Sequence, residues 1–501
     1  MTKSKFPPKR PDNSHIVKVP IKQNWSSYQK DIFRAVSQHA GHIVVEALAG
    51  SGKTSTLVES FRYVPKGKKV IALAFNKKIQ EELRSRAPSY IQDVLTFHSL
   101  GLRAIKQRFG NGIEVDQNKS FNIVKGLVPD EKNYDLITNI CDTIAYCKHS
   151  LRDTPKQIED IIYEFNVDLC ETQLSEFISL VIRSLGLCKS QTSKVDFDDM
   201  CYFPFVYNLP MGTFSIIYVD EYQDLNKSQM VMAKRICHPT DGKLVIFGDK
   251  FQDLYSWRSS DSSLVEEIKQ QPDTKILPLP ISYRCPKQII ELAQNWVSNI
   301  SCPSTAIEGE IKDISQNELY KLVKPGCFIL SRTNAPMIKI CMSLIRNGIK
   351  ANIKGRDIGK QLSSLIKKSK KKQIVSFLKW LEEWKNEEIV KLKDKNISPE
   401  NTLDRYECLI NLCDECKTLE EVSKKIDELF DDTDENNIVI LSTVHRAKGL
   451  ERQDVFLLKW TFRVWFDKMH LIEKPNEEAN IAYVAATRSK NRLFIVNKSI
   501  V

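Results

Sequence analysis

The stretch Ala-Leu-Ala-Gly-Ser-Gly-Lys-Thr at residues 47–54 decides how this sequence folds. The apolar run IVVEA at 43–47 leads into it and a helical pattern follows, which is the context of a phosphate-binding loop. Small residues let backbone N–H groups turn toward phosphate oxygens, and the helix adds its positive N-terminal end. A chance Gly/Ser turn is the alternative, and the flanking strand and helix argue against it.

Two residues of this loop carry particular chemistry. Lys53 is expected to reach the β- and γ-phosphates of a nucleotide, and the Thr54 hydroxyl is expected to ligate Mg²⁺. Ala47 replaces the usual first glycine, at a position that the closest phosphate approach does not need. The whole expected phosphate site comprises Ala47, Leu48, Ala49, Gly50, Ser51, Gly52, Lys53, Thr54 and Ser55.

A pair of acidic residues, Asp220 and Glu221, follows the apolar run at 214–219. A carboxylate at the carboxyl end of a parallel strand lies at the edge where open α/β sheets bind ligands. We expect Asp220 to hold Mg²⁺ through water and Glu221 to polarise the attacking water as a general base. A capping pair at the start of a helix is the alternative, which the presence of the loop at 47–54 disfavours.

Short apolar runs rich in Val and Ile recur along the chain, and runs of this kind predict strands buried on both faces of a parallel sheet. Helical patterns, such as 77–86 and 285–299, alternate with them, so the predicted fold class is α/β. The first set of runs is 43–47, 70–75, 94–97, 214–219, 244–247 and 276–280, and the second set is 326–331, 438–443, 454–458 and 492–496.

Two long stretches interrupt these sets with amphipathic helical patterns. We therefore expect two parallel-sheet cores, each with a mainly helical insertion. The expected division is a flexible basic arm at 1–24, a first core at 25–99 and 213–284 with its insertion at 100–212, and a second core at 285–360 and 437–501 with its insertion at 361–436.

The composition restricts the class of protein. The net charge is +11, of which residues 1–24 carry +5 from six basic residues and one acidic residue. This excess suits a polyanion partner, although a solubilising surface explains it equally well. No apolar run reaches the ~18 residues of a membrane span, and the N-terminus lacks the apolar block of a secretory signal. We expect a protein of the cytoplasm or nucleoid, or of the nucleus in a eukaryotic or viral setting, that is not secreted.

The cysteines point to a reducing compartment, because 13 scattered thiols in a long chain do not form a disulfide framework. Cys408, Cys413 and Cys416 have a spacing that suits either a metal or iron–sulfur site or an apolar helix face. No fourth ligand is near them, which favours the helix face.

A series of segments resembles, in order, the motifs of the UvrD/Rep/PcrA-type helicases of superfamily 1, the 3′→5′ branch. The form AFNKK at 74–78 resembles the F-box DNA helicase subgroup and viral relatives most. Departures from the pattern are Ser259 after Arg258, Cys285 after Arg284, and Arg452 after Glu451. The matching segments are 27–29, 47–54, 74–78, 96–100, 196–200, 220–224, 248–258, 282–284, 442–451 and 477–488.

The resemblance implies two RecA-like P-loop domains that hydrolyse ATP with Mg²⁺. By resemblance, Gln29 recognises adenine, Tyr283 stacks on it and Glu451 binds ribose. Gln252 senses the γ-phosphate, and Arg284 and Arg488 are arginine fingers that stabilise the charge of the transition state.

The resemblance also implies a motor that moves 3′→5′ on single-stranded DNA and unwinds tailed duplex DNA, with roles in DNA repair, recombination or replication. Core packing is the alternative for Phe75, Phe97, His98 and His445. The rival functions are an RNA helicase, an ATP-driven remodeller or sensor of protein–DNA complexes, and a helicase subunit of a nuclease or defence complex. The expected strand contacts are Phe75, Asn76, Thr96, Phe97, His98, Tyr255, Trp257, Arg258 and His445.

Overall fold

The computed structural model describes most of the chain. It covers residues 24–91, 93–128, 134–165, 167–170, 172–254, 263–394, 398–431, 437–463 and 475–498. The predicted basic arm lies outside these residues except for its last position, as do Tyr255, Trp257 and Arg258.

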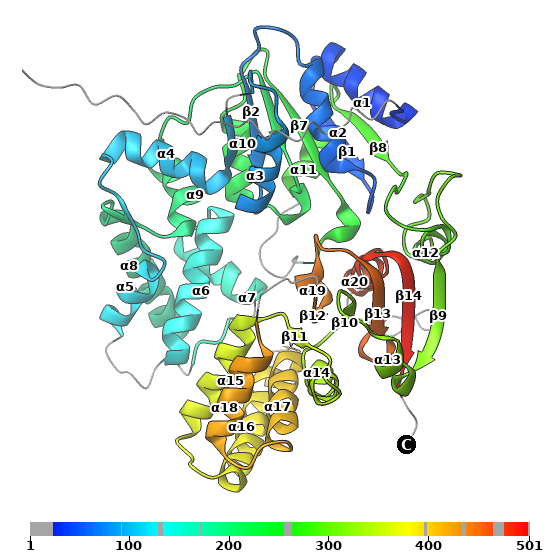
Figure 1. Ribbon diagram of the computed structural model, residues 1–501. Coiled ribbons are helices and arrows are strands. Elements are labelled where there is room, and N and C mark those ends of the chain that lie inside the picture. The colour runs from blue at the N-terminus through cyan, green and yellow to red at the C-terminus, as the bar shows by residue number, and fades with distance from the viewer. Residues whose placement is uncertain are drawn as a thin grey trace, which may run out of the picture.

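The first core contains a six-stranded parallel sheet in the order β3-β2-β6-β7-β1-β8 (Figure 1). Each run of the first predicted set forms one of its strands, so that prediction is confirmed. Because β7 lies between β1 and β6, the segments that follow these three strands meet at one edge. The strands are β1 (Ile43–Ala47), β2 (Val70–Ala74), β3 (Asp93–Thr96), β6 (Ile216–Val219), β7 (Lys243–Gly248) and β8 (Lys275–Leu279).

Helices cover the faces of this sheet, and short 3-10 turns follow β6 and β7. The predicted helix at 77–86 is confirmed as α3. The elements are α1 (Ser27–Gln38), α2 (Lys53–Ser60), η1 (Phe61–Tyr63), α3 (Lys77–Arg86), η3 (Tyr222–Asp224), α10 (Lys227–Arg235), η4 (Lys250–Gln252) and α11 (Ser263–Lys269).

The second core repeats this architecture with the strand order β11-β12-β10-β13-β14-β9, again all parallel. The second predicted set supplies four of these strands, which confirms the two-core α/β fold class. The other two, β9 and β11, were not predicted. The strands are β9 (Glu310–Ser315), β10 (Phe328–Ser331), β11 (Ala351–Ile353), β12 (Val439–Thr443), β13 (Arg452–Leu458) and β14 (Ser489–Asn497).

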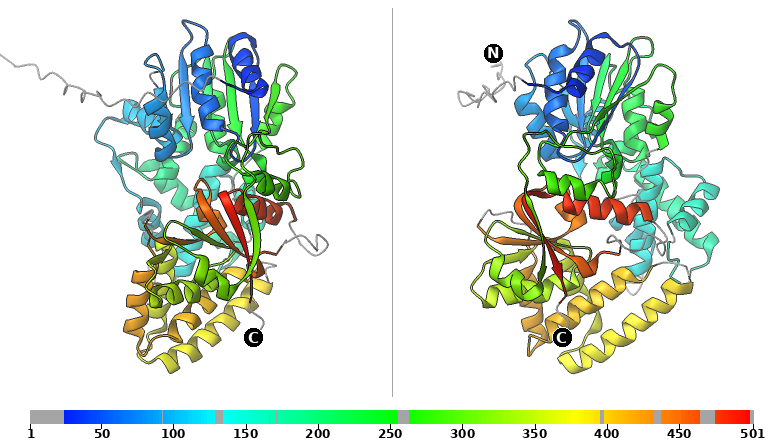
Figure 2. Two further views of the ribbon diagram at one scale, coloured as in Figure 1. Left: turned by 45° about the vertical axis from the view of Figure 1, so that its right-hand side comes forward. Right: turned by 90° about the vertical axis from the view of Figure 1, so that its right-hand side faces the viewer.

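The helices of the second core include α20, which lies between the two sheets and packs against η4 of the first core (Figure 2). The predicted helix at 285–299 is shorter than expected, because helical structure ends at Ala293. The elements are α12 (Lys287–Ala293), α13 (Gln316–Leu322), α14 (Ala335–Arg346), α19 (Val444–Ala447), η6 (Lys459–Thr461) and α20 (Pro475–Ala486).

Both insertions are mainly helical. The first is α4 (Phe97–Phe109), α5 (Lys119–Leu127), α6 (Tyr134–Ser150), α7 (Pro155–Glu164), α8 (Leu174–Ser190) and α9 (Phe197–Val206), with a small sheet of β4 (Glu114–Val115) and β5 (Lys194–Val195). The second is α15 (Arg356–Ser369), α16 (Ile374–Asp394), α17 (Glu400–Cys413) and α18 (Leu419–Leu429).

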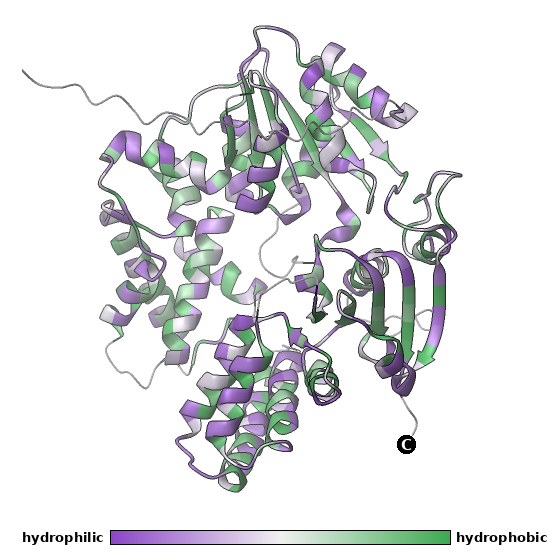
Figure 3. Cartoon of the chain, viewed as in Figure 1, coloured by the Kyte–Doolittle hydropathy of each residue, from purple (hydrophilic) through white to green (hydrophobic). Residues whose placement is uncertain are grey.

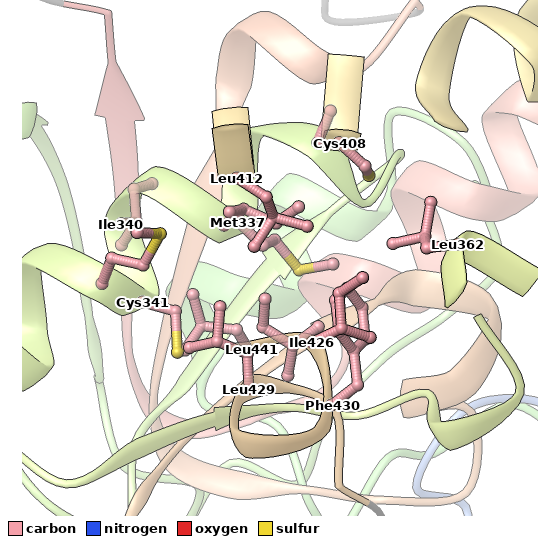
Figure 4. Packing of buried hydrophobic residues seen from close by; sticks show 14 of the residues in the cluster. Met337, Ile340, Cys341, Leu362, Cys408, Leu412, Ile426, Leu429, Phe430 and Leu441 are labelled. Atoms are coloured by element: carbon pink, nitrogen blue, oxygen red, sulfur yellow. The ribbon is translucent and has the colours of Figure 1, made fainter. Parts of the chain in front are cut away.

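Apolar residues follow the sheets and the inward faces of the helices (Figure 3). Figure 4 shows Cys408 among Leu412, Met337 and other apolar side chains of the second insertion and core. Burial raises the pKa of Cys413 to about 12, so its thiol stays protonated. These contacts support the interpretation of this spacing as an apolar helix face, and no cluster of metal-ligating side chains occurs among the described residues.

A buried charge network ties the first insertion together. Lys119 Nζ donates to Asp199 at 2.7 Å, and Lys148 Nζ pairs with Asp196 at 2.8 Å and with Asp199 at 2.9 Å. All four side chains are almost fully buried, so opposite charges compensate for their desolvation. Asp196 also caps α9, and the network therefore fixes where that helix begins.

Among the described residues, none of the helices combines the length and the apolar composition that a membrane span requires.

Candidate active site

The loop at 47–54 wraps from the end of β1 into α2, with Gly50 and Gly52 in the left-handed region at φ 73° and 76°. A Cβ on Gly50 would lie 2.6 Å from both Arg284 Cβ and Ser282 Oγ, so only glycine allows this approach. The backbone N–H of Tyr283 donates to the Gly50 carbonyl at 2.8 Å. The segment 282–284 therefore lies directly on the loop.

The N–H groups of this loop do not all face the same way. Leu48 N–H donates to the Leu279 carbonyl at 3.0 Å, and Ala49 N–H donates to the Tyr483 hydroxyl at 2.8 Å. The side chains of Ala47, Leu48, Ala49 and Ser51 are buried. The first turn of α2, which holds Lys53, Thr54 and Ser55, has N–H groups without intrahelical acceptors, as every helix start does. These N–H groups suit phosphate oxygens.

Lys53 lies against both predicted carboxylates. Its Nζ forms an ion pair with Glu221 and lies 3.8 Å from Asp220 Oδ1. Burial disfavours the charge of Lys53, but Glu221 and Asp220 outweigh burial and raise its pKa. Burial also opposes charge on Glu221, yet Lys53 and Lys448 lower the pKa of Glu221 to about 2. The glutamate is therefore ionised, as a general base must be.

Asp220 differs from its neighbour. Burial raises its pKa to about 7, which Lys53 only partly offsets. Its Oδ2 is buried and has no hydrogen-bond partner among the residues that the structure describes. An unpartnered buried carboxylate oxygen is a good ligand for a hard divalent cation, so Asp220 suits Mg²⁺.

Glu221 has an unusual backbone. Its φ of 54° and ψ of 49° lie in the left-handed region, which a side chain with a Cβ rarely adopts. Gln223 Nε2 donates to Glu221 Oε2 at 2.6 Å and so holds the carboxylate in place. Backbone strain of this kind persists where surrounding contacts enforce it, and it occurs most often at functional sites.

Gln252 stands on the turn after β7. Its Nε2 donates to Asp249 Oδ2 at 2.8 Å, and the Asp249 N–H donates to Gln223 Oε1 at 2.9 Å. Asp249 is buried, and burial raises its pKa to about 6. The turns after β6 and β7 are therefore linked through hydrogen bonds at one edge of the sheet.

The two predicted fingers come from different elements. Arg284 pairs with Glu451, and Lys490 Nζ contacts the other oxygen of Glu451 at 2.5 Å. Arg488 is only 1% exposed. Its guanidinium donates to uncharged oxygens, the carbonyls of Val484 at 2.9 Å and Leu450 at 3.3 Å and the Thr487 hydroxyl at 3.3 Å.

Burial and the neighbouring Arg284 lower the pKa of Arg488 to about 10, which still leaves it charged at neutral pH. A buried cation whose closest acceptors are uncharged gains much from an anion. Arg284, whose Cβ lies beside Gly50, is close enough to Arg488 to contribute to the lowered pKa of that guanidinium.

Gln29 and Tyr283 both lie close to Gly52, where a Cβ would be 3.7 Å from Gln29 Nε2 and 3.9 Å from Tyr283 Cδ2. Gln29 forms a capping box with Ser26 and donates to Thr56 Oγ1 at 2.9 Å. Tyr283 is 38% exposed, so part of its side chain reaches solvent. Both side chains therefore lie next to the phosphate loop.

The expected strand contacts that belong to the described residues lie at the carboxyl ends of β2, β3 and β12. The Phe97 side chain is 0% exposed, because it starts α4 and packs in the core of the first sheet. Its burial contradicts the prediction that its ring contacts DNA. Phe75 is half-buried against the same core, Thr96 caps α4, and the exposed Asn76 caps α3. His445 is half-buried in α19.

His98 meets an aromatic side chain that received no role in the sequence analysis. Its ring lies edge-on to Phe197, with ring centroids 5.8 Å apart, and Phe197 is 46% exposed. Burial lowers the pKa of His98, which keeps the imidazole neutral. The two rings are in contact at the start of α4 and α9, where Phe197 is exposed and His98 is half-buried.

Comparison with known protein families shows which domains this chain resembles. Residues 28–273 match the UvrD/REP helicase N-terminal domain, and residues 354–499 match the UvrD-like helicase C-terminal domain. The chain belongs to the UvrD/Rep helicase family. The family resemblance inferred from the motifs is therefore confirmed.

Among similar UvrD/Rep proteins is the ATP-dependent DNA helicase PcrA of Bacillus subtilis, 26% identical over 301 residues, which are 53% of this chain and 39% of the relative. The PcrA of Staphylococcus epidermidis is 25% identical over 309 residues, covering 56% of this chain and 40% of the relative. That of Staphylococcus aureus is 26% identical over 297 residues, covering 53% and 39%. This UvrD/Rep chain thus matches about two fifths of the length of these relatives.

Proposed function

We propose that this chain is an ATP- and Mg²⁺-dependent motor that moves 3′→5′ on single-stranded DNA and unwinds tailed duplexes. The observation that carries the proposal is the meeting of both cores at one loop. The loop that holds Lys53 comes from the first core, whereas Tyr483, on α20, and Arg488, between α20 and β14, come from the second. ATP bound on this loop would contact both cores.

The chain's own groups account for hydrolysis. Glu221, ionised and held by Gln223, is placed to accept a proton from the attacking water. Lys53, Arg284 and Arg488 would balance the charge that develops on the γ-phosphate. Mg²⁺ held by Thr54 and Asp220 would neutralise charge on the β- and γ-phosphates. Gln252 would report whether the γ-phosphate is present.

Movement follows from the same arrangement. With ATP bound, both cores hold the γ-phosphate, which favours a closed arrangement. After hydrolysis that shared contact is lost and the cores can separate. If each core also holds the strand, alternating closure moves one core along it. We propose the division into two cores and two insertions given above, because the sheets are built from those segments.

Single-stranded DNA would lie across the carboxyl ends of β2, β3 and β12. The exposed ring of Phe197 beside His98, the cap residue Asn76 and the half-buried His445 are the groups placed there. Tyr255, Trp257 and Arg258 remain proposed contacts from the sequence and lie outside the described residues. Aromatic stacking is sequence-tolerant, as a motor requires.

A direct test compares ATP turnover with single-stranded DNA, with single-stranded RNA and without polymer, followed by unwinding of duplexes with a 3′ or a 5′ tail. We expect stimulation by DNA and unwinding from the 3′ tail. Stimulation by RNA alone would indicate an RNA helicase. Turnover without unwinding of either duplex would indicate a remodeller, or a subunit that needs a partner.

Replacing Phe197 with alanine should weaken DNA binding. Stacking of one base on an aromatic ring is worth about 1–3 kcal/mol, so the DNA concentration that half-maximally stimulates ATP turnover should rise about 5- to 150-fold. Turnover without DNA should not change. The matched control is Phe205→Ala, because Phe205 is 48% exposed and also lies on α9. Equal effects of the two variants would exclude a stacking role for Phe197.

A further inference from the structure

The hydroxyl of Tyr483 connects the second core to two parts of the first. Tyr483 lies on α20 and is 0% exposed. Its oxygen accepts the backbone N–H of Ala49, in the phosphate loop, at 2.8 Å. The same hydroxyl lies 3.4 Å from Asp249 Oδ2, to which it can donate.

Asp249 links the Tyr483 hydroxyl to Gln252. The carboxylate oxygen that faces Tyr483 also accepts Gln252 Nε2 at 2.8 Å. A hydrogen-bonded path therefore runs from the Ala49 N–H through the Tyr483 hydroxyl and Asp249 to the Gln252 amide. Because Asp249 is buried, losing one of its donors leaves a carboxylate that is less well satisfied and less precisely oriented.

Other groups of the second core hold the same turn. Lys448 Nζ donates to the Gln252 carbonyl at 2.5 Å and pairs with Asp224 at 2.5 Å. Asn480 Nδ2, on α20, donates to the Asp253 carbonyl at 3.2 Å. The ring of Phe251 lies edge-on to that of Tyr483, with centroids 6.2 Å apart. The turn at 249–253 therefore contacts the second core through several hydrogen bonds and one aromatic pair.

We infer that Tyr483 is a positioning residue, whose hydroxyl orients Gln252 toward the γ-phosphate only when the two cores are closed. Tyr483 and Arg488 lie five residues apart, at the end of α20 and just beyond it. A movement of α20 that withdraws Arg488 from the nucleotide also withdraws the hydroxyl from Asp249. Sensing of the γ-phosphate and engagement of the finger therefore occur together. This inference rests on the proposed ATP hydrolysis.

The test is Tyr483→Phe, which removes the hydroxyl and keeps the buried ring. A hydrogen bond to this site is worth roughly 0.5–1.5 kcal/mol, so kcat for DNA-stimulated turnover should fall about 2- to 10-fold. The KM for ATP should stay near the wild-type value, because the ring and the loop remain in place. The matched control is Tyr202→Phe, which removes a buried hydroxyl that donates to Asp153 at 2.9 Å, away from the nucleotide. Its kcat should equal that of the wild type.

A double-mutant cycle separates positioning from general destabilisation. If Tyr483 acts through Gln252, then Tyr483→Phe should change kcat little when Gln252 is already alanine. Equal fold losses with and without Gln252 would overturn the inference, as would a kcat for Tyr483→Phe equal to that of Tyr202→Phe. A wild-type chain without DNA-stimulated turnover would contradict the proposed function, and this inference with it. If the wild type shows DNA-stimulated turnover but Tyr483→Phe causes the same fold loss with and without Gln252, only the inference is contradicted.

Discussion

Alanine in place of Lys53 is expected to lower DNA-stimulated ATP turnover by about 10³-fold or more, because positioning and charge neutralisation supply most of the catalysis in phosphoryl transfer. The ammonium group lies between Glu221 and Asp220 and just before Thr54. Without it, the buried Asp220 and the half-buried Glu221 would have no cation from the loop beside them. Steady-state phosphate release with saturating DNA measures the loss.

The control for this variant is Lys30→Ala, which removes an exposed lysine of α1. We expect it to keep wild-type turnover. Circular dichroism should show that both variants are folded. If Lys53→Ala retains more than about a tenth of the wild-type turnover, the loop at 47–54 is not the catalytic phosphate site.

Replacing Arg488 is expected to be nearly as damaging. Loss of an arginine finger typically costs on the order of 10³-fold or more in turnover. Arg488→Lys keeps a charge but not the planar donor fork, so it should not restore the rate. Nucleotide binding should persist in both Arg488→Ala and Arg488→Lys, since Gln29, Tyr283 and the loop remain. A fluorescent ATP analogue measures binding, and single-turnover hydrolysis measures the chemical step.

Arg492→Ala is the matched control, because Arg492 lies four residues further along β14 and pairs with Asp454 at 2.5 Å. It should leave turnover unchanged. Thermal melting identifies any loss of folding caused by the space that Arg488→Ala leaves in a buried site. A folded Arg488→Ala variant that hydrolyses ATP at the wild-type rate would exclude the finger role.

The sequence predicts those features whose residues lie close together along the chain. The strand, small-residue loop and helix around Lys53 lie within about 20 consecutive residues, and apolar runs revealed most strands. The strand β9 was missed because its sequence EIKDIS is largely polar, as befits an edge strand. The strand β11 was missed because it has only three residues.

Side-chain direction and long-range contacts were not readable. Phe97 follows a strand and begins a helix, and nothing in the sequence tells whether its ring faces the core or the solvent. The contacts of Tyr483 with Ala49 and of Lys448 with Asp224 join residues 434 and 224 positions apart. Phe197 could have been noticed as an apolar residue beside a capping aspartate, but its exposure depends on how α9 packs against α4.

The strand order of the first sheet also sets when that sheet can form during synthesis. The strand β1 pairs with β7 and β8, and β2 pairs with β6 on one side. All three partner strands are synthesised after residue 215. A ribosome that has reached residue 215 has therefore released β1 without either neighbour, while the helices of the first insertion can already fold locally. We expect such a nascent chain to depend on chaperones until the late strands emerge and complete the sheet.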